Sequence, residues 1–292
     1  MHTMISQSGS NEKLSAAIPK RAMFIYSRPE GESQALPPRC KAALSSFRMH
    51  HPDFECEIYG RDEIEDFISS EYPEFRDEIR RFPLKIQRID VFRYLVIYRR
   101  GGFYFDLDIY FSEGLQPLLG EKCVFAFEEL TLSRYLRQSC NLDWELANYG
   151  FGSVPGHPFI GQLIDNCFRG LREPAWLKPM IDWVPLPFRD QFVAPVTTGP
   201  GMVSRTFAEY CRTSGDITVL FPQDVCDERY WQQFGEFAVH IMQASWRKTP
   251  GFVRGRLARM WEARLRSRTT LDSCEKGAIR QGNWICRFPV GA

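Results

Sequence analysis

Two aspartates, Asp106 and Asp108, carry the strongest chemical signal in the sequence. They lie in the run FYFDLDIYF, residues 103–111, where apolar and polar side chains alternate as they do on a half-buried strand. Residues two apart on a strand point the same way, so the two carboxylates share a face and repel each other. A divalent cation with oxygen ligands is a natural counter-charge, and it can also neutralise a departing diphosphate. The alternative is a solvated acidic pair at a strand end, because Asp-x-Asp alone is common by chance.

A helix and a turn precede this pair of aspartates. Apolar residues recur at helical spacing over residues 84–99, and Gly101-Gly102 ends the pattern. Asp90 and Arg93 are three apart on this helix, so they share one of its faces. Taken alone, they form an ordinary intrahelical salt bridge; beside the two aspartates, they become candidates for a binding site.

The run QRIDVFRYLVIYRRGGFYFDLDIYF, residues 87–111, resembles the signature of the DXD-containing glycosyltransferases of family 32. That family is similar to the catalytic domains of large clostridial glucosylating toxins. Its pattern is D-x-x-R-Y on a helix, a Gly-Gly turn and Y-x-D-x-D, matched here by Asp90, Arg93, Tyr94, Gly101, Gly102, Tyr104, Asp106 and Asp108. Weaker matches extend from Ile18 to Trp246: Ile18-Pro19-Lys20, Asn148, His157-Pro158, Thr198-Gly199-Pro200, His240 and Ser245-Trp246. The first strand departs from the family pattern, since Met23 and Tyr26 stand where the family has His and Trp.

The resemblance implies a single α/β domain with a GT-A-like nucleotide-sugar-binding fold, in which helices flank a mixed, mainly parallel sheet. It implies a retaining, metal-dependent hexosyltransferase that moves a sugar from a nucleotide-diphosphate sugar to an acceptor hydroxyl. The expected cofactor is Mn²⁺ or Mg²⁺, and the expected donor is a UDP- or GDP-sugar. The acceptor class stays open between carbohydrate, lipid and protein. Polysaccharide or glycolipid biosynthesis is the expected process.

The same resemblance assigns metal and donor roles to individual residues. Asp108 is expected to bind the metal, and Asp106 to bind either the metal or the ribose of the donor. His240 is expected to bind the metal or the diphosphate, although a His in the apolar stretch AVHIM is by itself more typical of a core residue. Asp90 and Arg93 are expected to hold the donor sugar and, with the two aspartates, form the catalytic set.

Further donor contacts follow from the weaker matches. Tyr26 is expected to stack on the nucleobase, and Tyr104 to line the donor pocket or simply pack within its strand. Asn148 is expected on the acceptor side, at the donor sugar, or as the cap of a turn. Ser245 and Trp246 are expected to contact the diphosphate, with burial as the alternative for Trp246.

Composition excludes several other classes of protein. The chain has 292 residues and a net charge of +1, which argues against a nucleic-acid binder. Nine cysteines without a CxxC pair favour free thiols in a reducing compartment, and the sequence shows no signal peptide, so we expect a cytoplasmic protein. No GxGxxG, GxxxxGK[ST], GxSxG or HExxH motif occurs.

The element pattern predicts three parts. Residues 1–17 form a polar, mobile leader, and residues 18–250 form the transferase domain. Within it we expect strands at 19–27, 54–60, 103–111, 123–128 and 216–222, helices at 39–50, 61–70, 84–99, 157–171 and 202–212, and irregular chain at 173–200. Residues 251–292 form a basic tail.

The tail begins with an unusual concentration of positive charge. Residues 247–269 hold eight basic side chains and one acidic side chain, while Val253, Leu257, Met260, Trp261 and Leu265 share a helical face. This helix is expected either to close the domain or to make a peripheral contact with an anionic membrane.

Two other functions remain open at this stage. One is a nucleotide-sugar-binding protein with little or no turnover, which the intact set Asp90, Arg93, Asp106 and Asp108 argues against. The other is an effector that glycosylates a host protein, which nothing in the sequence requires.

Overall fold

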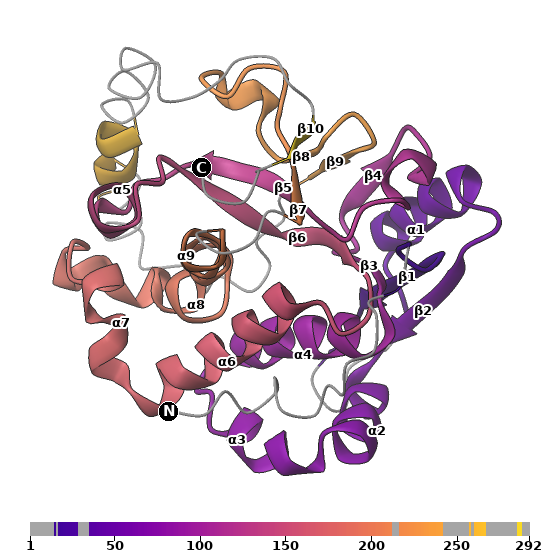
Figure 1. Ribbon diagram of the computed structural model, residues 1–292, viewed down its shortest axis with the longest axis horizontal. Helices are drawn as coiled ribbons and strands as arrows, with labels where there is room; N and C mark the ends of the chain where they lie inside the picture. Colours follow the sequence, from indigo (N-terminus) through magenta and orange to yellow (C-terminus); the bar gives the residue numbers. More distant parts are fainter. Residues whose placement is uncertain are drawn as a thin grey trace.

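The computed structural model describes residues 15, 17–28, 35–211, 216–241, 257, 260–266 and 285–287. In this part of the chain, a seven-stranded sheet has the order β10-β7-β5-β6-β3-β1-β2 (Figure 1). Its strands are β1 (Arg21–Ile25), β2 (Glu55–Tyr59), β3 (Gly102–Phe105), β5 (Cys123–Leu130), β6 (Trp144–Ser153), β7 (Ile217–Leu220) and β10 (Ile285–Arg287). Strands β6 and β10 run opposite to the others. The expected α/β fold with a mixed, mainly parallel sheet is therefore confirmed.

Helices flank the sheet, whose central strands are buried on both faces. The α-helices are α1 (Pro38–His50), α2 (Arg61–Glu71), α3 (Arg76–Arg80), α4 (Lys85–Arg100), α5 (Arg134–Ser139), α6 (Pro158–Arg172), α7 (Pro174–Ile181), α8 (Val193–Thr197) and α9 (Pro200–Tyr210). Short 3₁₀ turns lie at Pro73–Phe75, Gln116–Leu118, Leu186–Gln191 and Glu228–Tyr230. Among the described residues, no helix is both long and apolar enough to cross a membrane.

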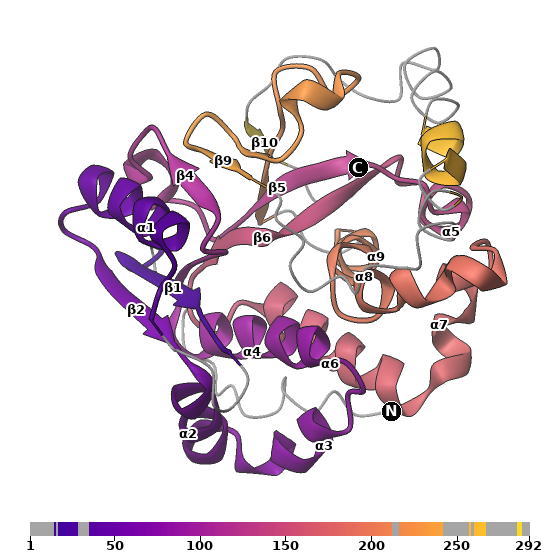
Figure 2. The same ribbon diagram turned by 180° about the vertical axis from the view of Figure 1, so that it is seen from behind.

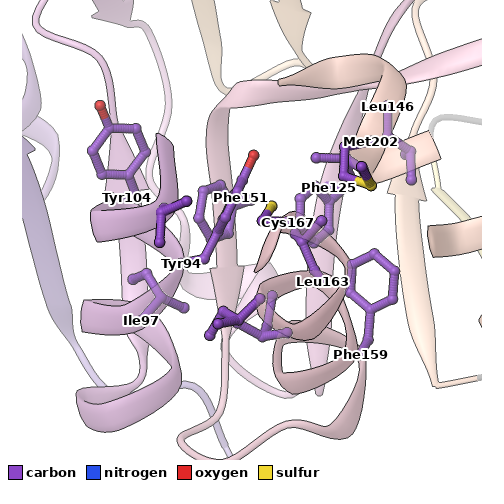
Figure 3. Packing of buried hydrophobic residues seen from close by; sticks show 14 of the residues in the cluster. Tyr94, Ile97, Tyr104, Phe125, Leu146, Phe151, Phe159, Leu163, Cys167 and Met202 are labelled. Atoms are coloured by element: carbon purple, nitrogen blue, oxygen red, sulfur yellow. The ribbon is translucent and has the colours of Figure 1, made fainter. Parts of the chain in front are cut away.

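Alternate residues of the central strands belong to two separate hydrophobic cores. Met23 and Tyr104 pack with side chains of α4, α6 and α9 on one face of the sheet. Figure 3 shows Tyr104, Phe125 and Phe151 from the strands pointing toward the residues of these helices. The other face is the one beside α1 (Figure 2), and Phe24 and Phe105 pack there with Leu44 and Phe47 of that helix. Both faces of the strands are thus buried, and exposed chemistry is confined to the strand ends.

The expected strand over residues 103–111 is wrong in one respect, because it breaks at the two aspartates. Residues 106–108 form a turn in which the Ile109 amide donates to the Asp106 carbonyl at 3.3 Å. The chain then leaves the main sheet and enters a three-stranded sheet of order β4-β9-β8, made of β4 (Ile109–Phe111), β8 (Gln233–Phe234) and β9 (Ala238–His240). The apolar alternation continues across the break because both halves face the same core.

The central strand β6 was not predicted from the sequence. Its Asn148, Gly150 and Gly152 are residue types depleted in strands. The pairing with β3 explains the glycines: Phe103 lies opposite Gly152 and Phe105 opposite Gly150. A Cβ atom on Gly152 would meet the Phe103 ring at 2.4 Å, so the missing side chains make room for the rings of the neighbouring strand.

Two further details of the expected layout need correction. Residues 173–200, expected to be irregular, contain α7, a 3₁₀ turn and α8, since prolines fit in the first turn of a helix. Cys226 is disulfide-bonded, whereas Cys40, Cys56, Cys123, Cys140, Cys167 and Cys211 are free as expected. The spacing of cysteines in the sequence could not reveal this disulfide, because a disulfide requires the Cα atoms of two cysteines to lie close together in the fold. Strand β10, at residues 285–287, pairs with β7.

The Gly101-Gly102 turn fixes where the chain re-enters the sheet before the aspartates. Both glycines have positive φ, at 65° and 102°. A Cβ atom on Gly102 would lie 2.7 Å from the Arg21 carbonyl oxygen, so the turn passes too close to β1 for any side chain. The register that sets Tyr104 within β3 and Asp106 directly after its carboxyl end depends on this turn.

His51 is a buried structural histidine beneath α1. Its Nδ1 lies 2.8 Å from the Phe47 carbonyl oxygen, and its Nε2 accepts the Leu115 amide at 3.0 Å. Burial lowers the pKa of His51 below its ordinary value of 6.5, against an opposing contribution from the Phe47 carbonyl. The fold therefore prefers the neutral ring.

A folded-state pKa below the unfolded value makes stability depend on pH in a definite direction. The contribution of neutral His51 to stability is complete above about pH 6.5 and is lost as the pH falls through the pKa of His51 in the folded protein. It is lost because the unfolded chain binds a proton that the folded chain does not. The free energy of unfolding, measured by urea titration between pH 5 and 7.5, should fall as the pH is lowered. The fall should be steeper in the wild type than in His51→Gln, by up to about 1.4 kcal/mol per pH unit. Equal pH slopes would contradict this assignment.

Candidate functional site

Two carboxylates and one imidazole meet at the end of β3. One ligand atom each from Asp106, Asp108 and His240 can be chosen so that all three atoms lie within 4.8 Å of one another. The two aspartates occupy the turn between β3 and β4, and His240 ends β9. Pairing of β4 with β9 sets Ile109 opposite His240, and the Ile241 amide donates to the Asp108 carbonyl at 2.9 Å. Backbone pairing thus holds residues from distant parts of the sequence together.

The His240 ring is closely held. Its Nε2 lies 3.1 Å from Asp108 Oδ1, and its ring stacks on Tyr149 with centroids 4.3 Å apart. Burial alone would lower the pKa of His240, but hydrogen bonding to Asp108 and the nearby charge of Asp106 outweigh burial and raise it. His240 therefore lies beside the two aspartates, where a metal or diphosphate ligand would have to be.

The chemistry of these three groups fits a divalent cation. Asp106 and Asp108 offer carboxylate oxygens, which Mg²⁺ and Mn²⁺ both accept, while the imidazole of His240 suits Mn²⁺ better than Mg²⁺. A cation would also relieve the repulsion between the two carboxylates. The residues expected to bind a metal are therefore gathered at one place.

Beside this cluster lies a buried ion pair. Arg93 and Asp90 leave only 4% of their side-chain surface exposed, and Arg93 Nη2 lies 3.1 Å from Asp90 Oδ1. The intrahelical salt bridge, which the sequence offered as the alternative to a binding role, is therefore present. Arg93 also reaches out of its helix, with Nη1 2.6 Å from the Asn148 carbonyl oxygen and 3.6 Å from Asp106 Oδ1. The ion pair is thus joined to the first aspartate of the motif.

Asp90 is surrounded by hydrogen-bond donors. Thr198 Oγ1 donates to Asp90 Oδ2 at 2.8 Å, and Asn148 Nδ2 donates to Asp90 Oδ1 at 3.1 Å. Burial raises the pKa of Asp90 to about 6, although Arg93, Thr198 and Asn148 all favour the ionised form. At neutral pH the pair is therefore charged, as the permanently cationic guanidinium requires.

The remaining predicted residues fall into three groups. Tyr104 and Asn148 belong to the cluster: the Tyr104 hydroxyl donates to Asp106, its ring lies 4.6 Å below the Arg93 guanidinium, and Asn148 lies on β6 rather than in a turn. Tyr26 directly follows β1, with the Arg28 guanidinium carbon 5.7 Å from its ring centroid. Ser245 and Trp246 lie outside the described residues.

Three neighbours of the site were not recognised as functional from the sequence. Thr198 was noted only as part of a Thr-Gly-Pro match, while Tyr149 and Gln232 carried no motif at all. Gln232 Oε1 lies 2.9 Å from His240 Nδ1. Its one unusual property is a φ of 62°, which becomes visible only in the folded chain.

A hollow in the surface lies away from this site. It has a volume of about 810 Å³ and is lined by residues of β2 and α2 together with Arg100. None of Asp90, Arg93, Asp106, Asp108 or His240 lines it, so it takes no part in the site described above.

A known protein family has a sequence profile that covers most of the residues gathered at this site. Residues 37–125 match the profile of the family described as glycosyltransferase sugar-binding region containing DXD motif. That range includes α4, the glycine turn and both aspartates of the motif. The resemblance inferred from the sequence is therefore confirmed.

Three similar proteins carry names that describe mannosylation of inositol phosphoceramide. Inositol phosphoceramide mannosyltransferase 3 of Schizosaccharomyces pombe is 30% identical over 52% of this chain and 38% of its own length. Inositol phosphoceramide mannosyltransferase 1 of the same organism is 30% identical over 76% of this chain and 61% of its own length. Mannosyl phosphorylinositol ceramide synthase CSH1 of Saccharomyces cerevisiae is 28% identical over 60% of this chain and 41% of its own length. The chain thus spans less than two thirds of each of these relatives.

Among solved structures, a PaToxG glycosyltransferase covers 66% of this chain and 70% of its own, with 13% sequence identity and a TM-score of 0.46.

Asp108→Asn should remove most of the affinity for Mn²⁺ while leaving the fold intact. The substitution keeps the size of the side chain but removes the charge that faces His240. We expect the Mn²⁺ dissociation constant, measured by electron paramagnetic resonance with GDP present, to rise more than about 100-fold, since even changes to outer partners of a metal site cost about 10- to 100-fold. Asp62→Asn is the matched control, because 82% of the Asp62 side chain is exposed on α2. Unchanged Mn²⁺ binding in folded Asp108→Asn would remove this residue from the metal site.

Proposed function

We propose that this chain is a metal-dependent glycosyltransferase that moves mannose from a nucleotide-diphosphate mannose to a hydroxyl group of a lipid acceptor, with retention of anomeric configuration. The observation that carries the proposal is the convergence of Asp106, Asp108 and His240 beside the buried Asp90–Arg93 pair. The DXD match supports glycosyl transfer. The names of the relatives support mannose as the sugar and an inositol phosphoceramide-like lipid as the acceptor.

Each residue of the cluster has a part in this proposal. Asp106, Asp108 and His240 hold Mn²⁺, which when bound acts as a Lewis acid toward the leaving diphosphate. Tyr26, after β1, stacks on the nucleobase of the donor. Tyr104 orients Asp106 through its hydroxyl group, so that the carboxylate does not have to reorganise when the donor enters.

The Asp90–Arg93 pair forms the floor of the donor-sugar site. Because both side chains are almost fully buried, they can present only a few atoms to the sugar, and those atoms are fixed by Asn148 and Thr198. A buried and already charged pair orients sugar hydroxyl groups without paying side-chain entropy on binding. The proposed catalytic set is therefore Asp90, Arg93, Asp106 and Asp108.

The basic tail is the proposed membrane contact of an otherwise cytoplasmic protein. Part of its apolar face turns inward, since the Trp261 ring stacks on Trp183 with centroids 5.8 Å apart. The same segment is also held by an ion pair, in which Arg266 Nη2 lies 2.8 Å from Glu129 Oε2. Another part turns outward: Leu257 is 52% and Met260 64% exposed. This division supports a segment that docks on the domain and presents apolar side chains among basic ones, as peripheral membrane helices do.

Donor chemistry tests the proposed activity directly. A panel of GDP-mannose, UDP-glucose and UDP-galactose should show Mn²⁺-dependent hydrolysis of one donor, GDP-mannose, and its loss in Asp108→Asn. With an inositol phosphoceramide acceptor, nuclear magnetic resonance of the product should show the α-anomer. Tight, metal-dependent donor binding without hydrolysis or transfer would indicate a nucleotide-sugar-binding protein instead, and an inverted product would exclude retention.

Vesicle binding tests the tail. The wild type should sediment with vesicles that contain anionic lipid, and added salt should weaken binding because the charges are exposed. Replacing both Leu257 and Met260 with Ser should weaken binding by at least about tenfold through lost apolar contact. Met49→Ser is the matched control, because Met49 is 71% exposed on α1, outside the tail. Equal binding by all three proteins would assign the tail a purely structural role.

A further inference from the structure

Gln232 connects the candidate metal ligand His240 to a carboxylate on β5. Its side-chain oxygen Oε1 lies 2.9 Å from His240 Nδ1, and its side-chain nitrogen Nε2 donates to Glu128 Oε1 at 3.3 Å. A continuous chain of contacts therefore runs from Asp108 through His240 and Gln232 to Glu128.

The chemistry of this chain fixes the direction of each hydrogen bond. The amide nitrogen of Gln232 can only donate, and it faces Glu128 Oε1. The amide oxygen then faces His240, and because that oxygen can only accept, His240 Nδ1 must carry a proton. In the neutral ring, the lone pair consequently lies on Nε2, the nitrogen that faces Asp108.

The backbone of Gln232 is held in an unusual conformation by the same histidine. Its φ of 62° is left-handed, which is uncommon for a residue with a side chain. The Gln232 carbonyl accepts the His240 amide at 2.8 Å, so the two residues are joined through both backbone and side chains. Such a conformation costs stability and persists only where the surroundings require it.

We propose that Gln232 is a positioning residue of the metal site, which fixes the tautomer and the ring orientation of His240 so that Nε2 is presented to the cation. Glu128 acts through Gln232 by fixing the orientation of its amide group. This inference rests on the proposed function for the identity of the cation. It gives Gln232 the outer-partner role that carboxylates and carbonyls have around other metal-bound histidines.

Two substitutions separate positioning from stability. Gln232→Met keeps the length of the side chain but removes both hydrogen bonds, and Gln232→Gly removes the side chain while relieving the strain of the positive φ. Each should raise the Mn²⁺ dissociation constant, measured by electron paramagnetic resonance with GDP present, by about 10- to 100-fold. The thermal midpoint of Gln232→Gly should be no lower than that of Gln232→Met. Gln233→Met is the matched control one residue along, where Tyr149 bonds to the backbone carbonyl rather than to the side chain.

A second measurement needs no metal. In ¹⁵N-labelled wild-type protein, the Nδ1 resonance of His240 should be that of a protonated nitrogen with a slowly exchanging proton, whatever the state of Nε2. In Gln232→Met, that proton should exchange with water at least about tenfold faster, because its acceptor is gone. If wild-type protein binds no Mn²⁺ but shows the protected Nδ1 proton, the proposed function fails while the positioning of His240 by Gln232 stands. Wild-type Mn²⁺ affinity in both Gln232 variants, or an unprotonated Nδ1 in the wild type, would overturn the inference.

Discussion

The buried guanidinium of Arg93 is the interaction on which the rest of the site depends. A charge placed almost out of contact with water must be paired, or the fold becomes strongly unstable. Arg93 meets this requirement with Asp90 on its own helix, the Asn148 carbonyl on β6 and Asp106 after β3. These partners come from α4 and from the ends or interiors of two neighbouring strands. Pairing the Arg93 guanidinium therefore fixes the helix against the sheet and orients the first aspartate of the motif.

A second constraint acts through the small sheet. The main sheet ends at Phe105, and the chain can build the metal cluster only because β4 leaves it to pair with β9. That pairing brings His240 to Asp108 across more than a hundred residues of sequence. The two sheets share a core in which Phe105 packs against Phe111 and Phe234. Hydrophobic packing thus holds the junction between the two sheets, while the polar groups at this junction remain available for chemistry.

The site and the start of the tail are connected through the same part of the fold. Glu128 and Glu129 are adjacent on β5: Glu128 accepts the Gln232 amide, and Glu129 pairs with Arg266. Arg266 also lies over the ring of Trp231, the residue before Gln232. The docked helical segment at residues 260–266 therefore packs against the strand end and the turn that hold His240. A membrane contact by this segment would lie next to the proposed metal site, as a lipid acceptor requires.

The sequence by itself determined the residue types of the site and most of the elements that carry them. Asp90 and Arg93 on a helix, the glycine turn and the alternating run around Asp106 and Asp108 are local patterns, and local periodicity is written in neighbouring residues. The tertiary structure alone decided that the strand breaks at the aspartates, that glycine-containing β6 lies at the centre of the sheet, and that Gln232 faces His240. Each of these depends on a partner far away in the chain: β9 for the break, the rings of Phe103 and Phe105 for the glycines, and Glu128 for the amide. Such pairings arise from packing and register between distant segments, which one-dimensional spacing does not encode.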